Sequence, residues 1–93
     1  MADQLKPIRV ILADDHELVL EGLQALLQDE EDIQVVATAK DGAELMGAVY
    51  QHEPDVVVLD LMMPRLGGVA CLERIRAEGL PIRVLVLTAF SDG

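Results

Sequence analysis

The sequence predicts an α/β fold in which helices pack on both faces of a parallel β-sheet. Short strand-like runs alternate with amphipathic, helix-like segments along the chain. Alternation at this spacing requires right-handed crossover connections, and these make consecutive strands parallel. One run, residues 55–60 (DVVVLD), is apolar between its two acids, which is typical of a central strand buried on both faces.

The first half of the chain contains two predicted strands and a helix between them. Residues 8–13 (IRVILA) and 33–39 (IQVVATA) are rich in β-branched side chains and predict the strands. Residues 16–28 carry apolar side chains at helical spacing, namely Val19, Leu23, Leu26 and Leu27. The four acids at 29–32 predict a loop, because negative charge opposes the negative end of a helix dipole.

A second helix is expected to begin at the Asp41-Gly42 pair, with Asp41 as its N-cap. Its apolar side chains form pairs four residues apart, Leu45/Val49 and Met46/Tyr50. Pro54 follows where a helix can no longer continue, and the third strand comes directly after it.

The remaining elements are a loop, a helix and a strand. Met62, Met63, Pro64, Gly67 and Gly68 belong to the predicted loop. Residues 69–78 predict a third helix, which Gly79 closes at the C′ position with Pro81 beyond it. Residues 82–88 (IRVLVLT) predict the fourth strand.

Composition limits the class of protein. A chain of 93 residues allows one small domain, and with 52% hydrophobic but only 2% aromatic residues its core must be aliphatic. The formal charge of −10 argues against contact with nucleic acid. No apolar run is long enough to span a membrane, and the N-terminus lacks a secretory signal pattern. The single cysteine, Cys71, fits a reducing cytoplasm.

Three carboxylates stand where predicted strands end. Asp14 and Asp15 follow the first strand and Asp60 ends the third. If these strands are neighbours, about 4.8 Å apart, the acids converge, and then either one pKa must rise or a cation must bind. Mg²⁺ suits such a set, and a carboxylate beside it suits phosphoryl transfer, with Asp60 as the nucleophile. Thr88 ends the fourth strand and could bond a phosphate oxygen, although threonine is also an ordinary strand residue.

The motifs VILADDHELVLEGLQALL, VVVLDLMMPRLGG and VLVLTA resemble the receiver domain of two-component response regulators, from residue 8 to the end of the chain. They are most similar to the LuxR/NarL/FixJ-type branch, which carries a C-terminal helix-turn-helix output domain. The resemblance implies a flavodoxin-like doubly wound sheet with strand order 2-1-3-4 and three helices. It also implies a cytoplasmic phosphoprotein that regulates transcription.

The resemblance assigns a role to each matching residue. Asp60 would accept the phosphoryl group, and Asp15 would ligate Mg²⁺ directly. Asp14 would hold the ion through water, and Met62 would offer its backbone carbonyl. The implied partner is a sensor histidine kinase. The reaction implied, for the intact domain only, is Mg²⁺-dependent self-phosphorylation with autodephosphorylation, so the protein is not expected to be an enzyme.

Three further residues receive roles in the same way. Thr88 would be the switch hydroxyl, while Pro64 and Gly68 would shape the loop after the phosphorylation site. Gly67 departs from the family, since many members carry an acidic or amide residue there. His16 is expected to begin the first helix and face solvent, because a site for a hard cation prefers oxygen ligands.

The family's fourth helix, fifth strand and fifth helix have no counterpart in these 93 residues. The phosphate-pairing lysine is absent with them, and neither Lys6 nor Lys40 lies on the expected strand end. Residues 1–93 are therefore expected to be a partial receiver without an output domain. Residues 82–88 would then form an exposed edge, through which two chains could pair or exchange elements.

Two other functions are alternatives to phosphoacceptance. One is a module that is no longer phosphorylated and serves only protein contacts or self-association. The other is a fragment of a nucleotide triphosphatase, since VVVLD resembles a strand whose acid handles Mg²⁺. That class needs a GxxxxGK[ST] loop after an early strand, and this chain has DDHELVLEG instead.

Overall fold

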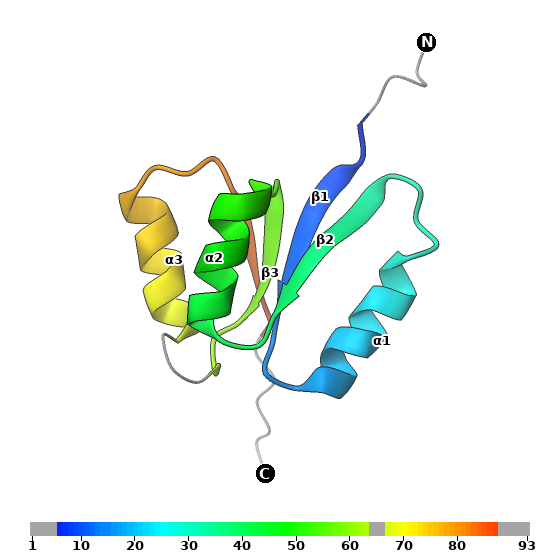
Figure 1. Ribbon diagram of the computed structural model, residues 1–93, viewed down its shortest axis with the longest axis horizontal. Helices are drawn as coiled ribbons and strands as arrows, with labels where there is room; N and C mark the ends of the chain where they lie inside the picture. The colour runs from blue at the N-terminus through cyan, green and yellow to red at the C-terminus, as the bar shows by residue number, and fades with distance from the viewer. Residues whose placement is uncertain (1–5, 64–66, 88–93) are drawn as a thin grey trace.

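The computed structural model describes residues 6–63 and 67–87. Their elements in chain order are β1 (Ile8–Ala13), α1 (Glu17–Leu27), β2 (Ile33–Ala39), α2 (Gly42–His52), β3 (Val56–Asp60), α3 (Gly68–Ala77) and β4 (Arg83–Leu87). The four strands pair in parallel in the order β2-β1-β3-β4. Figure 1 shows α2 and α3 together on one side of the sheet and α1 on the other. The predicted fold class and strand order are both confirmed.

Each face of the sheet has its own core, because successive side chains of a strand point to opposite faces. On β1, Ile11 and Ala13 join the larger core beneath α2 and α3. Val10 and Leu12 join a smaller core with Leu20 of α1. Each fully buried side chain of this size contributes about 1.5–3 kcal/mol to stability. The core beneath α2 and α3 holds eleven buried residues and the core beneath α1 holds three, so most of this stabilisation comes from the α2/α3 face.

The ends of α2 and α3 follow the predicted capping chemistry. The Asp41 carboxylate accepts a hydrogen bond of 2.8 Å from the Glu44 backbone N–H, as an N-cap should. At the end of α3, Gly79 has a φ of 66°. Its N–H donates to the Arg76 carbonyl and that of Leu80 donates to the Ile75 carbonyl, which together form a Schellman motif. These local signals explain why the helix limits could be predicted closely.

Some predicted limits shift by one residue. Residue 55 was expected in the third strand, but the strand begins at Val56. The Asp55 carboxylate accepts from the Arg9 N–H at 2.9 Å, while its own N–H donates to the Arg9 carbonyl at 2.8 Å. These two hydrogen bonds hold Asp55 beside the start of β1, just ahead of β3. The third helix begins at Gly68 rather than at residue 69.

β4 lies at the edge of the described sheet, beside β3 only. Leu85, Val86 and Leu87 are 57%, 41% and 42% exposed, although they are apolar. Within the described residues β4 is thus an apolar edge, and pairing through it stays a prediction. No helix in the described ranges is both long enough and apolar enough to cross a membrane.

Candidate functional site

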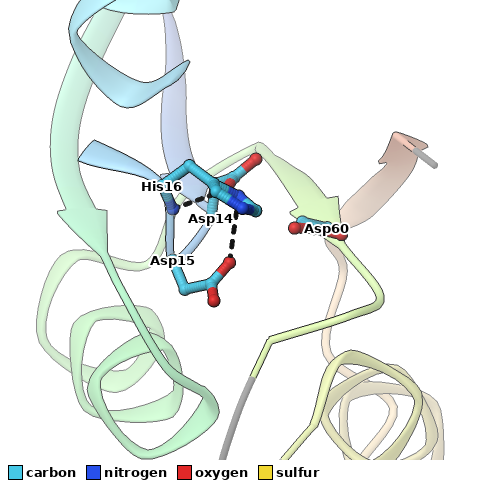
Figure 2. Close-up of side chains that lie close together, drawn as sticks. All are labelled: Asp14, Asp15, His16 and Asp60. Atoms are coloured by element: carbon cyan, nitrogen blue, oxygen red, sulfur yellow. Dashed lines mark hydrogen bonds and ion pairs between the residues drawn. The ribbon is translucent and has the colours of Figure 1, made fainter. Parts of the chain in front are cut away.

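The candidate site lies at the carboxyl end of β1 and β3. These strands pair in register up to Ala13 opposite Leu59, so Asp14, directly after β1, lies beside Asp60, the last residue of β3. One ligand atom from each of Asp14, Asp15, His16 and Asp60 lies within 4.8 Å of the others. Figure 2 shows Asp60 facing the other three side chains across the end of the sheet. The fold thus brings the three predicted carboxylates together.

The two central carboxylates are buried. Asp14 and Asp60 are each 7% exposed, whereas Asp15 and His16 face solvent. The backbone of Asp14 is tied to the neighbouring strand, since its N–H donates to the Ala39 carbonyl of β2 at 3.0 Å. A buried charge is costly unless it is paired or coordinates a metal. Two buried carboxylates at the ends of neighbouring strands therefore favour the binding of a cation between them.

A tight turn after β3 orients Asp60. Its Oδ1 accepts a hydrogen bond of 2.9 Å from the Met62 backbone N–H, two residues ahead. The Met62 side chain points into solvent and is 75% exposed. The Met62 backbone thus contacts Asp60 while its side chain does not, and the role of its carbonyl as a metal ligand stays a prediction.

His16 makes contacts that the sequence reasoning missed. It begins α1 as the N-cap residue, and its side chain is 67% exposed, as expected. However, its Nδ1 lies 2.8 Å from Asp14 Oδ1 and 3.1 Å from Asp15 Oδ1. The hydrogen bond to Asp14, and then the charge of Asp15, raise the pKa of His16 above its ordinary value. Its place directly after two acids in a turn was the one available signal.

Gly68 lies against the backbone that follows the site. A Cβ at this position would come within 2.6 Å of the Leu61 Cα and 2.8 Å of the Asp60 carbonyl oxygen. Glycine is therefore required for α3 to begin this close to the end of β3. At Gly67, by contrast, a Cβ would meet the Met63 carbonyl oxygen at an ordinary 3.6 Å. Pro64 and Thr88 lie outside the described residues.

Neither described lysine belongs to the acidic cluster. Lys40 follows β2 and pairs with Glu17 of α1 at 3.1 Å, and Lys6 precedes β1 at the opposite end of the sheet. The cluster therefore combines three carboxylates with one histidine. Oxygen donors in this number fit Mg²⁺, which takes a few carboxylates and keeps positions for water and phosphate. The donor set suits phosphoryl transfer to a carboxylate.

Comparison with known proteins identifies the family. A sequence profile described as the response regulator receiver domain matches residues 10–93. The chain belongs to this family. Single relatives are bacterial regulators, and the transcriptional regulatory protein LnrK of Bacillus subtilis is 40% identical over 91% of this chain. The nitrate/nitrite response regulator homolog of Haemophilus influenzae is 41% identical over 95% of it.

Solved receivers share the fold. The signal receiver domain of the regulator NarL from Mycobacterium tuberculosis superposes with a TM-score of 0.87 and 36% identity, over 94% of this chain and 70% of that one. A LuxR-family regulator from Aurantimonas gives 0.83 and 34%, over 92% and 61%. The chain spans 39% of LnrK and 41% of the Haemophilus regulator. The receiver assignment excludes the nucleotide triphosphatase alternative.

Proposed function

We propose that this receiver accepts a phosphoryl group on Asp60 from a phosphohistidine of a sensor histidine kinase. A carboxylate oxygen of Asp60 would attack phosphorus as the bond between phosphorus and the histidine nitrogen breaks. The imidazole would leave with that electron pair, and the product is an aspartyl phosphate. The main support for the proposal is that Asp60, Asp14 and Asp15 converge at the carboxyl ends of β1 and β3.

The three carboxylates have different roles in this proposal. Asp15 and Asp60 would bind Mg²⁺ directly, Asp14 would hold it through water, and the Met62 carbonyl would complete the protein's share. When bound, Mg²⁺ offsets negative charge on the phosphate oxygens. The Met62 N–H, which already donates to Asp60 Oδ1, holds the carboxylate plane so that the other oxygen can face the donor.

The phosphorylated state would be read elsewhere in a longer regulator. Thr88 is proposed as the hydroxyl that binds the phosphate, as the resemblance implies. Relatives such as LnrK are named transcriptional regulatory proteins, and they extend well beyond the matched segment. We therefore propose that the whole protein regulates transcription and that this segment acts only on its own aspartate.

Intact mass spectrometry after incubation with acetyl phosphate tests the proposal. We expect one phosphoryl adduct that requires Mg²⁺ and is absent from Asp60→Asn. Asp55→Asn is the matched control, because it removes the same charge from the opposite end of the β3 segment. An adduct that persists in Asp60→Asn, or one that forms equally without Mg²⁺, would contradict the proposal.

A second candidate function is self-association through β4, and the exposed edge favours it. Beside this edge a groove of about 410 Å³ lies between α3 and β4, with Leu72, Val84 and Val86 among its lining residues. An apolar edge strand offers unpaired backbone groups to another copy of the chain. Such a module would form contacts without phosphorylation.

Sedimentation at micromolar concentration tests this second candidate. Self-association predicts a concentration-dependent dimer that Leu85→Lys weakens. Leu26→Lys, which replaces a leucine 72% exposed on α1, should have no effect. A compact monomer at every concentration would exclude self-association.

A further inference from the structure

His16 stands at the N-cap of α1 without capping the helix. Its φ of −98° and ψ of 111° are those of an ordinary N-cap, yet its side chain makes no hydrogen bond to the first turn. Short polar side chains are preferred here because they satisfy the N–H groups that a helix start leaves open. A position that breaks such a local rule often serves a site instead.

The His16 side chain turns toward the acidic cluster (Figure 2). Its Nδ1 lies 2.8 Å from Asp14 Oδ1 and 3.1 Å from Asp15 Oδ1. The His16 backbone N–H also donates to Asp14 Oδ1, at 2.8 Å. One residue thus contacts both carboxylates that follow β1, and it binds the buried one, Asp14, twice.

These contacts limit how the two carboxylates can rotate. Two donors hold Oδ1 of Asp14, so the plane of this carboxylate is fixed. The direction of its other oxygen, Oδ2, is fixed with it. Carboxylates that bind metal ions are commonly oriented by such outer hydrogen bonds, and losing one typically lowers metal affinity about 10–100-fold.

We propose that His16 is a positioning residue for Mg²⁺. Its Nδ1–H holds Asp14 and Asp15 in the arrangement that admits the ion beside Asp60. This inference rests on the proposed function, because it assumes that the acidic cluster binds Mg²⁺. Both the Nδ1–H tautomer and the imidazolium donate from this nitrogen, so the role requires only the donor.

The opposite role predicts the opposite sign. A histidine that only competed with the ion for carboxylate oxygens would weaken Mg²⁺ binding, and its removal would strengthen it. A positioning histidine strengthens binding, and its removal weakens it. The dissociation constant for Mg²⁺ therefore separates the two roles.

Isothermal titration calorimetry with MgCl₂ measures this constant without any phosphoryl transfer. His16→Phe keeps a ring but removes the donor, and we expect about 10-fold weaker binding or more. His16→Asn carries an amide N–H on the atom equivalent to Nδ1, and it should recover most of the affinity. His52→Phe removes the other imidazole, at the far end of α2, and should bind as the wild type does. Urea denaturation of the metal-free variants verifies that each is folded.

Three results would overturn the inference. If wild type binds Mg²⁺ and His16→Phe binds it equally or more tightly, the positioning role is wrong while the proposed function stands. If His16→Asn is as weak as His16→Phe, the Nδ1–H donor is not what matters. If the wild type binds no Mg²⁺, the proposed metal site fails, and the role of His16 fails with it.

Discussion

The charged residues at the two ends of the β1–β3 pair have different neighbouring groups. At the amino end, the backbone N–H of Arg9 donates to the Asp55 carboxylate at 2.9 Å, and the Arg9 guanidinium donates to the His52 carbonyl at 2.6 Å. Cation and anion are both present there. At the carboxyl end, Asp14 and Asp60 are buried side by side, and among the described residues the ion pairs of this cluster involve His16 alone.

This difference separates a structural charge from a functional one. Asp55 closes the start of a strand and has its partner within the protein. At the other end Asp60 also accepts a backbone hydrogen bond, from Met62, but among the described residues His16 is the one basic group beside the three carboxylates. Like charges this close together favour the binding of a cation. Carboxylates left in this state at a strand end indicate a site, whereas the Arg9–Asp55 contact indicates stability.

The largest expected effect is stabilisation of the carboxyl end by Mg²⁺. At 100 times its dissociation constant, a ligand that binds only the folded state adds about 2.7 kcal/mol to the free energy of unfolding. Asp15→Asn should abolish most of this gain, and Asp55→Asn should keep it. Urea denaturation with and without MgCl₂ measures the difference. Equal gains in both variants would mean that the ion does not bind at the carboxyl end.

Crowding at the carboxyl end gives the next effect. Gly68→Ala would drive a methyl group into backbone at 2.6–2.8 Å, and we expect a loss of about 1–3 kcal/mol. Gly22→Ala is the matched change in α1, where nothing lies within 4 Å of the added methyl. It should stabilise the protein by about 0.5–1 kcal/mol, as alanine does within a helix. Equal urea midpoints for the two variants would contradict this packing.

Neutralising one acid at each end compares the two regions directly. In metal-free buffer, Asp60→Asn should raise the free energy of unfolding by on the order of 1 kcal/mol, because it removes repulsion from Asp14. Asparagine can still accept from the Met62 N–H. Asp55→Asn should lower stability by about 0.5–1 kcal/mol, because it weakens the contact with Arg9. Changes of the same sign in the two variants would show that the ends do not differ in charge balance.

The smallest effect concerns an exposed cluster on α2 and α3. The Tyr50 hydroxyl donates to Glu78 at 2.7 Å and Arg74 Nε donates to it at 3.2 Å. The hydrogen bond from Tyr50 and then that from Arg74 lower the pKa of Glu78 below its ordinary 4.5. The two hydrogen bonds stabilise the folded state. Their contribution is present above pH 4.5 and is lost as the pH falls through the lowered pKa of Glu78. The difference between wild type and Glu78→Gln in urea should therefore shrink on acidification, and a constant difference would contradict it.

Much of the fold could be predicted because its signals are local. Alternating β-branched runs marked the strands, Asp41 marked the start of α2, and Gly79 marked the end of α3. The helical spacing of Met46 and Tyr50 was also clear. It could not show that Met46 is buried while Tyr50 turns outward to Glu78, because that depends on the distance to α3.

The candidate site was predictable in part for a similar reason. Asp14, Asp15 and Asp60 could be named from their positions at strand ends, but their convergence depends on β1 and β3 being neighbours. The contacts of His16 and the close approach of Gly68 are set by turns, whose geometry the residue pattern does not specify. Thr88 and Pro64 stay predictions, since both lie outside the described residues.

The most direct test is to locate the phosphoryl group by chemical trapping. The protein is incubated with acetyl phosphate and Mg²⁺, reduced with borohydride, which converts an aspartyl phosphate to homoserine, and digested for peptide sequencing by mass spectrometry. We predict homoserine at position 60, dependent on Mg²⁺ and absent after Asp15→Asn. Homoserine at position 14, 15 or 55 instead, or at position 60 regardless of Mg²⁺, would contradict the assignment of Asp60 as the metal-assisted phosphoacceptor.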